Sequence, residues 1–224
     1  MEEYERSAAN VESRLRNNIL RMPEEIQKAS GISIYGRKIK SLVFTTDLAI
    51  IKNCDADAVF AVYPFTPQPS ISEAIIKASY IPVFCGVGGG VTKGFRTVSL
   101  AKDAENQGSI GVVMNAPITN MNLLAVSRAV DIPVVITVAD EMTDVGLRIE
   151  SGASILNVAA GAKTAQIVQN IRKEFPEVPI IATGGPPSDT ILETIDAGAN
   201  AITYTPPTTK ELFSEIMSGY RTDD

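Results

Sequence analysis

Pro179-Ile-Ile-Ala-Thr-Gly-Gly-Pro-Pro-Ser188 is the stretch of the chain that decides the fold. Its apolar first half has the length of a β-strand, and the strand pattern stops at Gly184 and Gly185. An amphipathic helix pattern follows over residues 188–197, and a second apolar run covers residues 201–204. This order of strand, glycine turn, helix and strand is typical of parallel α/β proteins.

The same alternation extends over most of the chain. Eight apolar runs have strand length, and they cover residues 41–46, 58–64, 82–88, 111–116, 133–139, 155–161, 179–185 and 201–206. Helical patterns follow these runs at 47–54, 70–79, 92–107, 120–130, 142–151, 164–175, 188–197 and 208–220. Apolar strands that alternate with helices indicate a parallel sheet buried on both faces, and eight units favour a closed barrel. The sequence therefore predicts an α/β fold of the (β/α)8 TIM-barrel type.

The first 40 residues lie outside this repeating pattern. A helical pattern covers residues 9–29 and is broken near Pro23, and a turn-prone stretch and a basic link follow it. No linker or low-complexity segment interrupts the chain. We expect a single barrel domain over residues 1–224, with an extra N-terminal helix and a link in residues 1–40.

Composition excludes several kinds of chemistry. The chain has 224 residues and a net charge of −6, which disfavours nucleic acid as a partner, and it has no apolar run long enough to span a membrane. It has no histidine, so it cannot form a Ser-His-Asp or Cys-His catalytic system. Its two cysteines and the acidic start of the chain, without a leader-like apolar segment, favour the cytoplasm.

The active end of such a barrel lies at the carboxyl ends of its strands, and that rule selects the candidate residues. Gly184 and Gly185 after one strand and the Thr208–Glu211 capping box after the next favour an anion, because glycine turns and helix N-termini offer free N–H groups. The alternative is that the glycines only permit a tight turn. Asn115 and Asn157 are polar residues in apolar strands, so each is expected to face a ligand or the barrel interior.

Acid–base chemistry must use other side chains, because histidine is absent. Asp140 and Glu141 are the best candidates, followed by Asp47, and Lys93 lies in a glycine-rich loop that could act as a lid. Carboxylates at this position could also hold Mg²⁺, and the residues specify no cofactor. The alternative for Asp140 and Glu141 is that they cap the helix that follows.

The segment from about residue 150 to 205 resembles a known family. Ile155-Leu-Asn-Val-Ala-Ala160 and Phe175-Pro-Glu-Val-Pro-Ile-Ile-Ala-Thr-Gly-Gly185 look like the late strands of the phosphate-binding (β/α)8 barrels. They are most similar to those of the 2-keto-3-deoxy-6-phosphogluconate aldolase-like group. The resemblance implies phosphate binding by Thr183, Gly184 and Gly185, and we place Thr208 and Thr209 beside them. The Schiff-base lysine of that group has no counterpart, because Asn157 is the nearest residue at its position.

Three functional hypotheses remain at this point. The leading one is a metabolic enzyme of the lyase or isomerase type that acts on a small phosphorylated or anionic carbonyl or sugar compound. The second is a metabolite-sensing regulatory barrel without catalysis, and the third is a metal-assisted hydrolase. A homo-oligomer is compatible with each of them.

Overall fold

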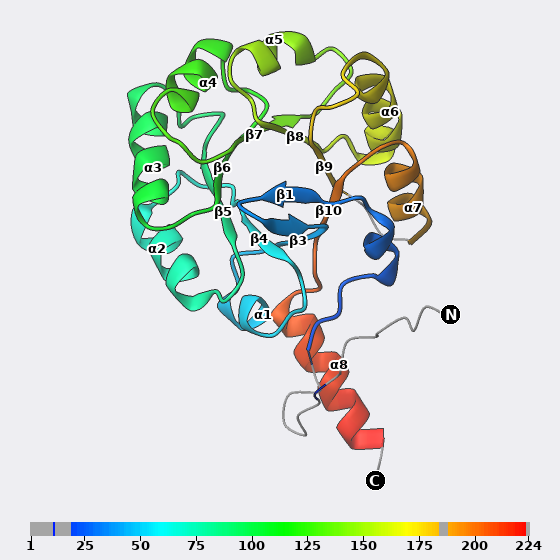
Figure 1. Cartoon of the computed structure of the whole chain (residues 1–224). Coiled ribbons are helices and arrows are strands. Elements are labelled where there is room, and N and C mark those ends of the chain that lie inside the picture. The colour runs from blue at the N-terminus through cyan, green and yellow to red at the C-terminus, as the bar shows by residue number, and fades with distance from the viewer. Residues whose placement is uncertain (1–10, 12–18, 184–187, 223–224) are drawn as a thin grey trace, which may run out of the picture.

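Eight parallel strands close into one barrel, as the sequence predicts (Figure 1). The computed structural model describes residue 11, residues 19–183 and residues 188–222. The order around the ring is β10-β3-β4-β5-β6-β7-β8-β9, so β10 closes the ring against β3. The strands are β3 (Ser41–Phe44), β4 (Ala58–Ala61), β5 (Val83–Gly88), β6 (Gly111–Met114), β7 (Val134–Val138), β8 (Ile155–Val158), β9 (Ile180–Thr183) and β10 (Ala201–Tyr204).

Helices join successive strands and form the outer ring of the barrel. They are α1 (Leu48–Lys52), α2 (Pro69–Ala78), α3 (Phe95–Asn106), α4 (Asn120–Ser127), α5 (Val145–Glu150), α6 (Thr164–Glu174) and α7 (Ser188–Asp196), with a short 3-10 turn, η2 (Gly161–Lys163), before α6. A further helix, α8 (Thr209–Thr222), follows the last strand, β10. Each unit therefore returns the chain to the same end of the barrel, so the loops after the eight strands gather at one mouth.

Side chains alternate along each strand between the inside of the barrel and the helix layer. One buried cluster joins inward residues of successive strands, among them Leu42, Phe60, Phe84 and Val135. A second, larger cluster joins outward strand residues with the helices, for example Val43 with Ile51. The continuous apolar runs of the sequence arise because both faces of every strand are buried.

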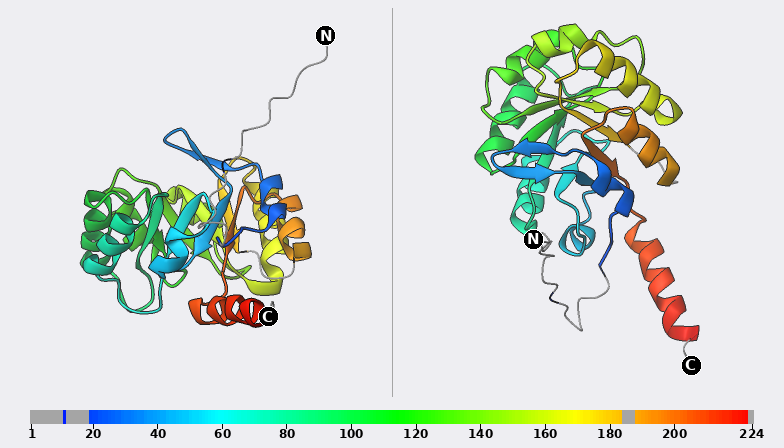
Figure 2. Two further views of the ribbon diagram at one scale, coloured as in Figure 1. Left: turned by 90° about the horizontal axis from the view of Figure 1, so that it is seen from below. Right: turned by 45° about the vertical axis from the view of Figure 1, so that its right-hand side comes forward.

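A β-hairpin that the sequence analysis missed closes the other end of the barrel. Strands β1 (Ile32–Ile34) and β2 (Arg37–Ile39) pair antiparallel across the turn at Tyr35 and Gly36. Tyr35 and Gly36 have φ angles of 48° and 78°, the combination that a two-residue hairpin turn requires. Ile32, Ile34 and Ile39 are buried in the same cluster as the barrel interior. The hairpin therefore plugs the end opposite the mouth (Figure 2).

The expected N-terminal helix over 9–29 is wrong over its described part. Leu20 forms a parallel bridge with Cys54, and only a 3-10 turn, η1 (Glu24–Lys28), follows Pro23. Proline has no backbone N–H group, and it prevents a continuous α-helix through this segment. Except for Val11, the first half of the expected helix lies outside the described residues.

Helix α8 projects away from the ring of helices, on the side opposite the hairpin (Figures 1 and 2). Its apolar residues Phe213, Ile216 and Tyr220 are 66%, 43% and 61% exposed. The expected homo-oligomer remains a prediction.

In the described part of the chain, no helix has both the length and the apolar character needed to cross a membrane.

Candidate functional site at the barrel mouth

A cavity of about 480 Å³ lies inside the barrel at the carboxyl ends of the strands. Its walls come from all of the strands or strand-end loops except those of β5, so it is built by the whole ring rather than by one loop. The lining residues are Phe44, Phe60, Val62, Tyr63, Pro64, Asn115, Thr137, Asn157, Ala159, Thr183 and Thr205. The structure thus brings together three of the residues that the sequence singled out, namely Asn115, Asn157 and Thr183.

Asn157 forms the most buried polar part of this cavity. Its side chain is held by the neighbouring strand, because Nδ2 donates to Thr137 Oγ1 at 3.3 Å. Its Oδ1 atom has no hydrogen-bond partner, although the residue is only 5% exposed. A buried acceptor without a partner is unusual in proteins and marks a place where a ligand could bind.

Aromatic side chains form the opposite wall. The rings of Phe44 and Phe60 lie 6.2 Å apart between centroids at 36°, and Phe60 and Phe84 repeat this spacing one layer deeper. β4 and β8 are four strands apart in a ring of eight, so Phe60 faces Asn157 across the barrel. The cavity therefore has one apolar and one hydrogen-bonding side.

The glycine-rich loop after β5 packs against Asn115. The backbone N–H group of Asn115 donates to the Gly88 carbonyl at 2.9 Å. Gly89 has φ +115°, and a Cβ atom there would lie 2.5 Å from the Asn115 Cβ. Only glycine therefore allows this close approach. Lys93, farther along the loop, is exposed and does not line the cavity.

The predicted anion site is only partly described. Thr183 lines the mouth cavity, whereas Gly184 and Gly185 lie outside the described residues. The expected capping box is present, since Thr208 N and Thr208 Oγ1 each donate to Glu211 Oε2 at 2.7 Å. These donors of Thr208 are thus already used by a carboxylate. Thr209 donates its hydroxyl hydrogen to Asp47.

Asp47 ties the first and last helices of the barrel together. Its Oδ1 atom caps α1 by accepting from the Ala49 and Ile50 N–H groups at 2.8 and 3.3 Å. The Thr209 hydrogen bond, helped by these backbone N–H groups, holds the pKa of Asp47 below its ordinary value of 3.8. A carboxylate with a depressed pKa contributes stability that is present above its unfolded-state pKa and is lost as the pH falls through its folded-state pKa.

We therefore expect the anchoring of α8 to depend on acidity. The wild type should be more stable than Asp47→Asn at neutral pH, and the difference should shrink as the pH falls below about 4. Urea unfolding over this pH range measures it, and Thr209→Val should reproduce the effect because it removes the hydroxyl donor. A stability difference that does not change with pH would contradict this role.

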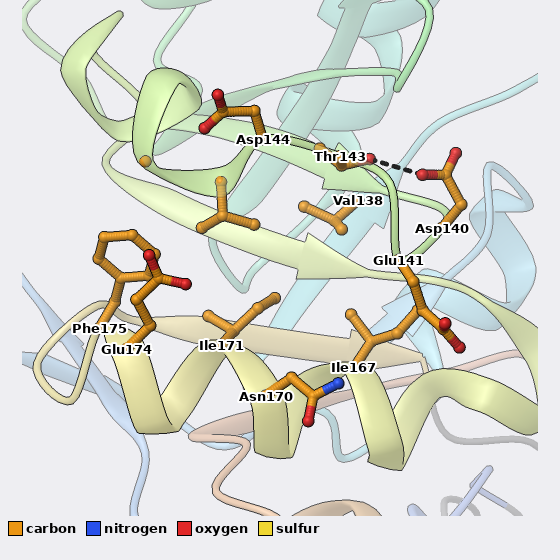
Figure 3. Close-up of a pocket in the computed structure, with 12 residues that line it drawn as sticks. Val138, Asp140, Glu141, Thr143, Asp144, Ile167, Asn170, Ile171, Glu174 and Phe175 are labelled. Carbon is orange, nitrogen blue, oxygen red and sulfur yellow. Dashed lines mark hydrogen bonds between the residues drawn. The ribbon is translucent and has the colours of Figure 1, made fainter.

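Asp140 and Glu141 lie in a different place from the mouth cavity. Asp140 Oδ1 accepts hydrogen bonds from Met142 N at 2.9 Å and Thr143 Oγ1 at 3.1 Å, within its own loop. Glu141 forms an exposed ion pair with Lys163 at 3.2 Å. Figure 3 shows both carboxylates around a lateral pocket of about 200 Å³, which α6 closes from the other side. This pocket and the mouth cavity have no lining residue in common.

Metal ligands do not gather in the described part of the chain. No group of three or more Asp, Glu, Cys or His side chains there could hold a metal ion. Binding of Mg²⁺ through one or two carboxylates, with water as the remaining ligands, stays a prediction.

Sequence reasoning missed several residues of the cavity. Thr137 lines it, and Thr203 lies beneath Thr205 on the inward face of β10. The available signal was the same one that selected the two asparagines, a polar residue within an apolar strand. Phe44 and Phe60 gave no such signal, because phenylalanine is expected in any strand of a buried sheet.

Comparison with known proteins identifies the fold. No protein-family model matches the chain, and no curated protein sequence matches it. Solved structures do match. Phosphoenolpyruvate phosphomutase from Streptomyces platensis subsp. rosaceus has 12% identity and a TM-score of 0.61, covering 81% of this chain and 80% of its own. Phosphonopyruvate hydrolase in complex with oxalate and Mg²⁺ has 11% identity and a TM-score of 0.61, covering 88% and 84%.

A third structure extends the comparison. 2,3-Dimethylmalate lyase, a member of the PEP mutase/isocitrate lyase superfamily, has 10% identity and a TM-score of 0.63, covering 88% of this chain and 84% of its own. The chain therefore has the (β/α)8-barrel fold. At such low identity the likeness shows the fold and does not carry over an activity.

Proposed function

We propose that the protein is an enzyme that binds a small phosphorylated or anionic carbonyl or sugar compound at the barrel mouth and acts as a lyase or isomerase. The observation that carries this proposal is the mouth cavity, in which the buried Asn157 presents an unpaired Oδ1 atom. In (β/α)8 barrels this end hosts the active site. The matching structures include enzymes whose names refer to small anionic compounds, phosphonopyruvate and 2,3-dimethylmalate, which supports a small anionic ligand.

Within this proposal, the anionic group binds at the rim after β9, where Thr183 leads to Gly184 and Gly185. The similarity to the 2-keto-3-deoxy-6-phosphogluconate aldolase-like group predicts the same place. Asp140, Glu141 and Lys93 remain the predicted acid–base groups, because they lie on loops that follow β7 and β5 at this end of the barrel. Their side chains do not line the mouth cavity, so their participation requires the loops to approach the ligand.

A regulatory barrel that binds the same metabolite without turnover is the second candidate. One observation favours it, namely that the residues lining the mouth cavity include no Asp, Glu, Lys or Arg. A cavity without such groups can recognise a ligand, but it offers no strong acid or base next to it.

A parallel assay of binding and turnover separates the two candidates. The purified protein is incubated with a panel of sugar phosphates and keto acids, with and without Mg²⁺, while ligand-induced shifts of the melting temperature are recorded. We expect at least one phosphorylated compound to raise the melting temperature and to be converted. Binding without conversion would support the regulatory barrel, and the absence of both would contradict a ligand site of this class.

A further inference from the structure

Four buried side-chain polar atoms in the described part of the chain have no hydrogen-bond partner: Thr97 Oγ1, Gln107 Oε1, Asn157 Oδ1 and Thr203 Oγ1. Two of the four belong to the barrel interior. Asn157 lines the mouth cavity, and Thr203 lies level with Thr183 on the inward face of the neighbouring strand. Leaving a buried polar atom unpaired is unfavourable for the folded protein, so two of them inside one barrel call for an explanation.

The two atoms have complementary hydrogen-bonding capacity. Because the Asn157 amide nitrogen donates to Thr137, its Oδ1 atom is the free end and accepts hydrogen bonds only. The Thr203 hydroxyl group, in a residue that is 1% exposed, can both donate and accept. A partner that satisfies both must carry at least one O–H or N–H donor. Hydroxyl groups next to a carbonyl or on a sugar chain have this chemistry.

The charge of the cavity limits the partner further. None of the cavity's lining residues carries a charge, so a carboxylate or phosphate placed at Asn157 would be buried without a cation and next to an acceptor oxygen. The opposite wall is the ring of Phe60, which suits the carbon skeleton of a ligand. The buried part of the ligand must therefore be uncharged, with one apolar and one hydroxyl-bearing side.

We propose that the cavity binds the uncharged hydroxyketone or polyol part of its ligand, with a ligand hydroxyl bonded to Asn157 Oδ1 and Thr203 Oγ1 and the carbon chain against Phe60. This inference rests on the proposed function and narrows it. The anionic group stays at the rim after β9, and only the hydroxylated part enters the barrel. Compounds that carry a second anionic group in place of the hydroxyketone are excluded from the cavity.

Calorimetric titration with four probes tests this division of the ligand. Dihydroxyacetone phosphate carries both parts, phosphoglycolate replaces the hydroxyketone by a carboxylate, inorganic phosphate has the anion alone and dihydroxyacetone has the neutral part alone. We expect dihydroxyacetone phosphate to bind the wild type about tenfold or more tightly than phosphoglycolate, because burial of an unpaired carboxylate is costly.

The matched variants are Thr203→Val and Thr97→Val. Both remove a buried, unpaired hydroxyl group without changing the side-chain shape, but Thr97 lies on α3, outside the barrel interior. Thr203→Val should weaken dihydroxyacetone phosphate binding about three- to tenfold and leave phosphate binding unchanged, because it removes one hydrogen bond. Thr97→Val should change neither. Both should raise the melting temperature by about 2–4 °C, since each removes an unpaired buried group.

The outcomes separate this inference from the proposed function. Two results would overturn the hydroxyl assignment and leave the anionic ligand class standing. The first is that phosphoglycolate binds as tightly as dihydroxyacetone phosphate. The second is that Thr203→Val binds dihydroxyacetone phosphate as tightly as the wild type does. If dihydroxyacetone binds but none of the phosphorylated probes does, the assignment stands and the anionic ligand class fails. If no probe binds, the assignment is overturned as well. A second variant, Asn157→Leu, supports the assignment if it weakens dihydroxyacetone phosphate binding at unchanged phosphate affinity, and overturns it if both affinities are unchanged.

Discussion

Replacement of Phe84 by alanine is expected to lower the free energy of unfolding by about 3–5 kcal/mol. Phe84 is fully buried inside the barrel, where its ring contacts that of Phe60. On the neighbouring strand β6, Gly111 leaves room for the ring, since a Cβ atom there would lie 2.7 Å from two Phe84 ring carbons. Alanine would leave a cavity that the rigid barrel wall cannot close, and the loss of buried contacts would not be recovered.

Chemical denaturation of the wild type and Phe84→Ala measures this loss. Phe65 provides the matched control, because it is 75% exposed in the loop after β4, and Phe65→Ala should change the stability by less than about 0.5 kcal/mol. Phe84→Leu should lie between the wild type and Phe84→Ala. A loss below about 1 kcal/mol in Phe84→Ala would mean that the barrel interior is not packed as described.

The second large effect concerns catalysis. If Asp140 is the general base of the proposed enzyme, Asp140→Asn should lower turnover by roughly 10²–10⁴ while ligand binding is retained. The substitution is conservative for the loop, because the amide oxygen can still accept the hydrogen bonds from Met142 and Thr143. Asn also caps helices and turns nearly as well as Asp. A loss of turnover in this variant would therefore result from removal of the negative charge and not from a change in the geometry of the loop.

Asp144 supplies the control for this experiment. It lines the same lateral pocket and caps α5 by accepting from Leu147 N at 2.9 Å, so Asp144→Asn removes a charge in an equivalent structural role. Steady-state kinetics should show lowered turnover in Asp140→Asn or Glu141→Gln, the two predicted acid–base carboxylates, and unchanged turnover in Asp144→Asn. If all three variants are as active as the wild type, Asp140 only caps its loop, and the regulatory barrel becomes the favoured candidate.

The repeating part of the fold could be predicted because it depends on local patterns. Each strand is apolar on both faces and each helix on one, and eight such units leave few arrangements other than a closed barrel. The hairpin was missed because each of its strands has only three residues, although the alternation of Ile32 and Ile34 before Tyr35-Gly36 is a hairpin signal. Its role as a plug depends on contacts with distant strands, which no local pattern reveals.

The candidate site was predicted only in part for a similar reason. Asn115 and Asn157 stood out as amides in apolar strands, and both line the cavity. Thr137 and Thr203 did not, because threonine is common in strands and its hydroxyl group is usually paired. Asp140 and Glu141 were selected for their position after a strand, but the loop after β7 places both carboxylates beside the lateral pocket. The direction that a loop takes cannot be derived from the end of a strand alone.

A crystal structure of the protein grown with dihydroxyacetone phosphate tests the central claim, that the ligand binds inside the barrel mouth, most directly. The account predicts electron density for the probe between Asn157 and Phe60, with its phosphate at the rim after Thr183. Density in the lateral pocket beside Asp140 and Glu141, with the mouth cavity unchanged, would contradict the claim.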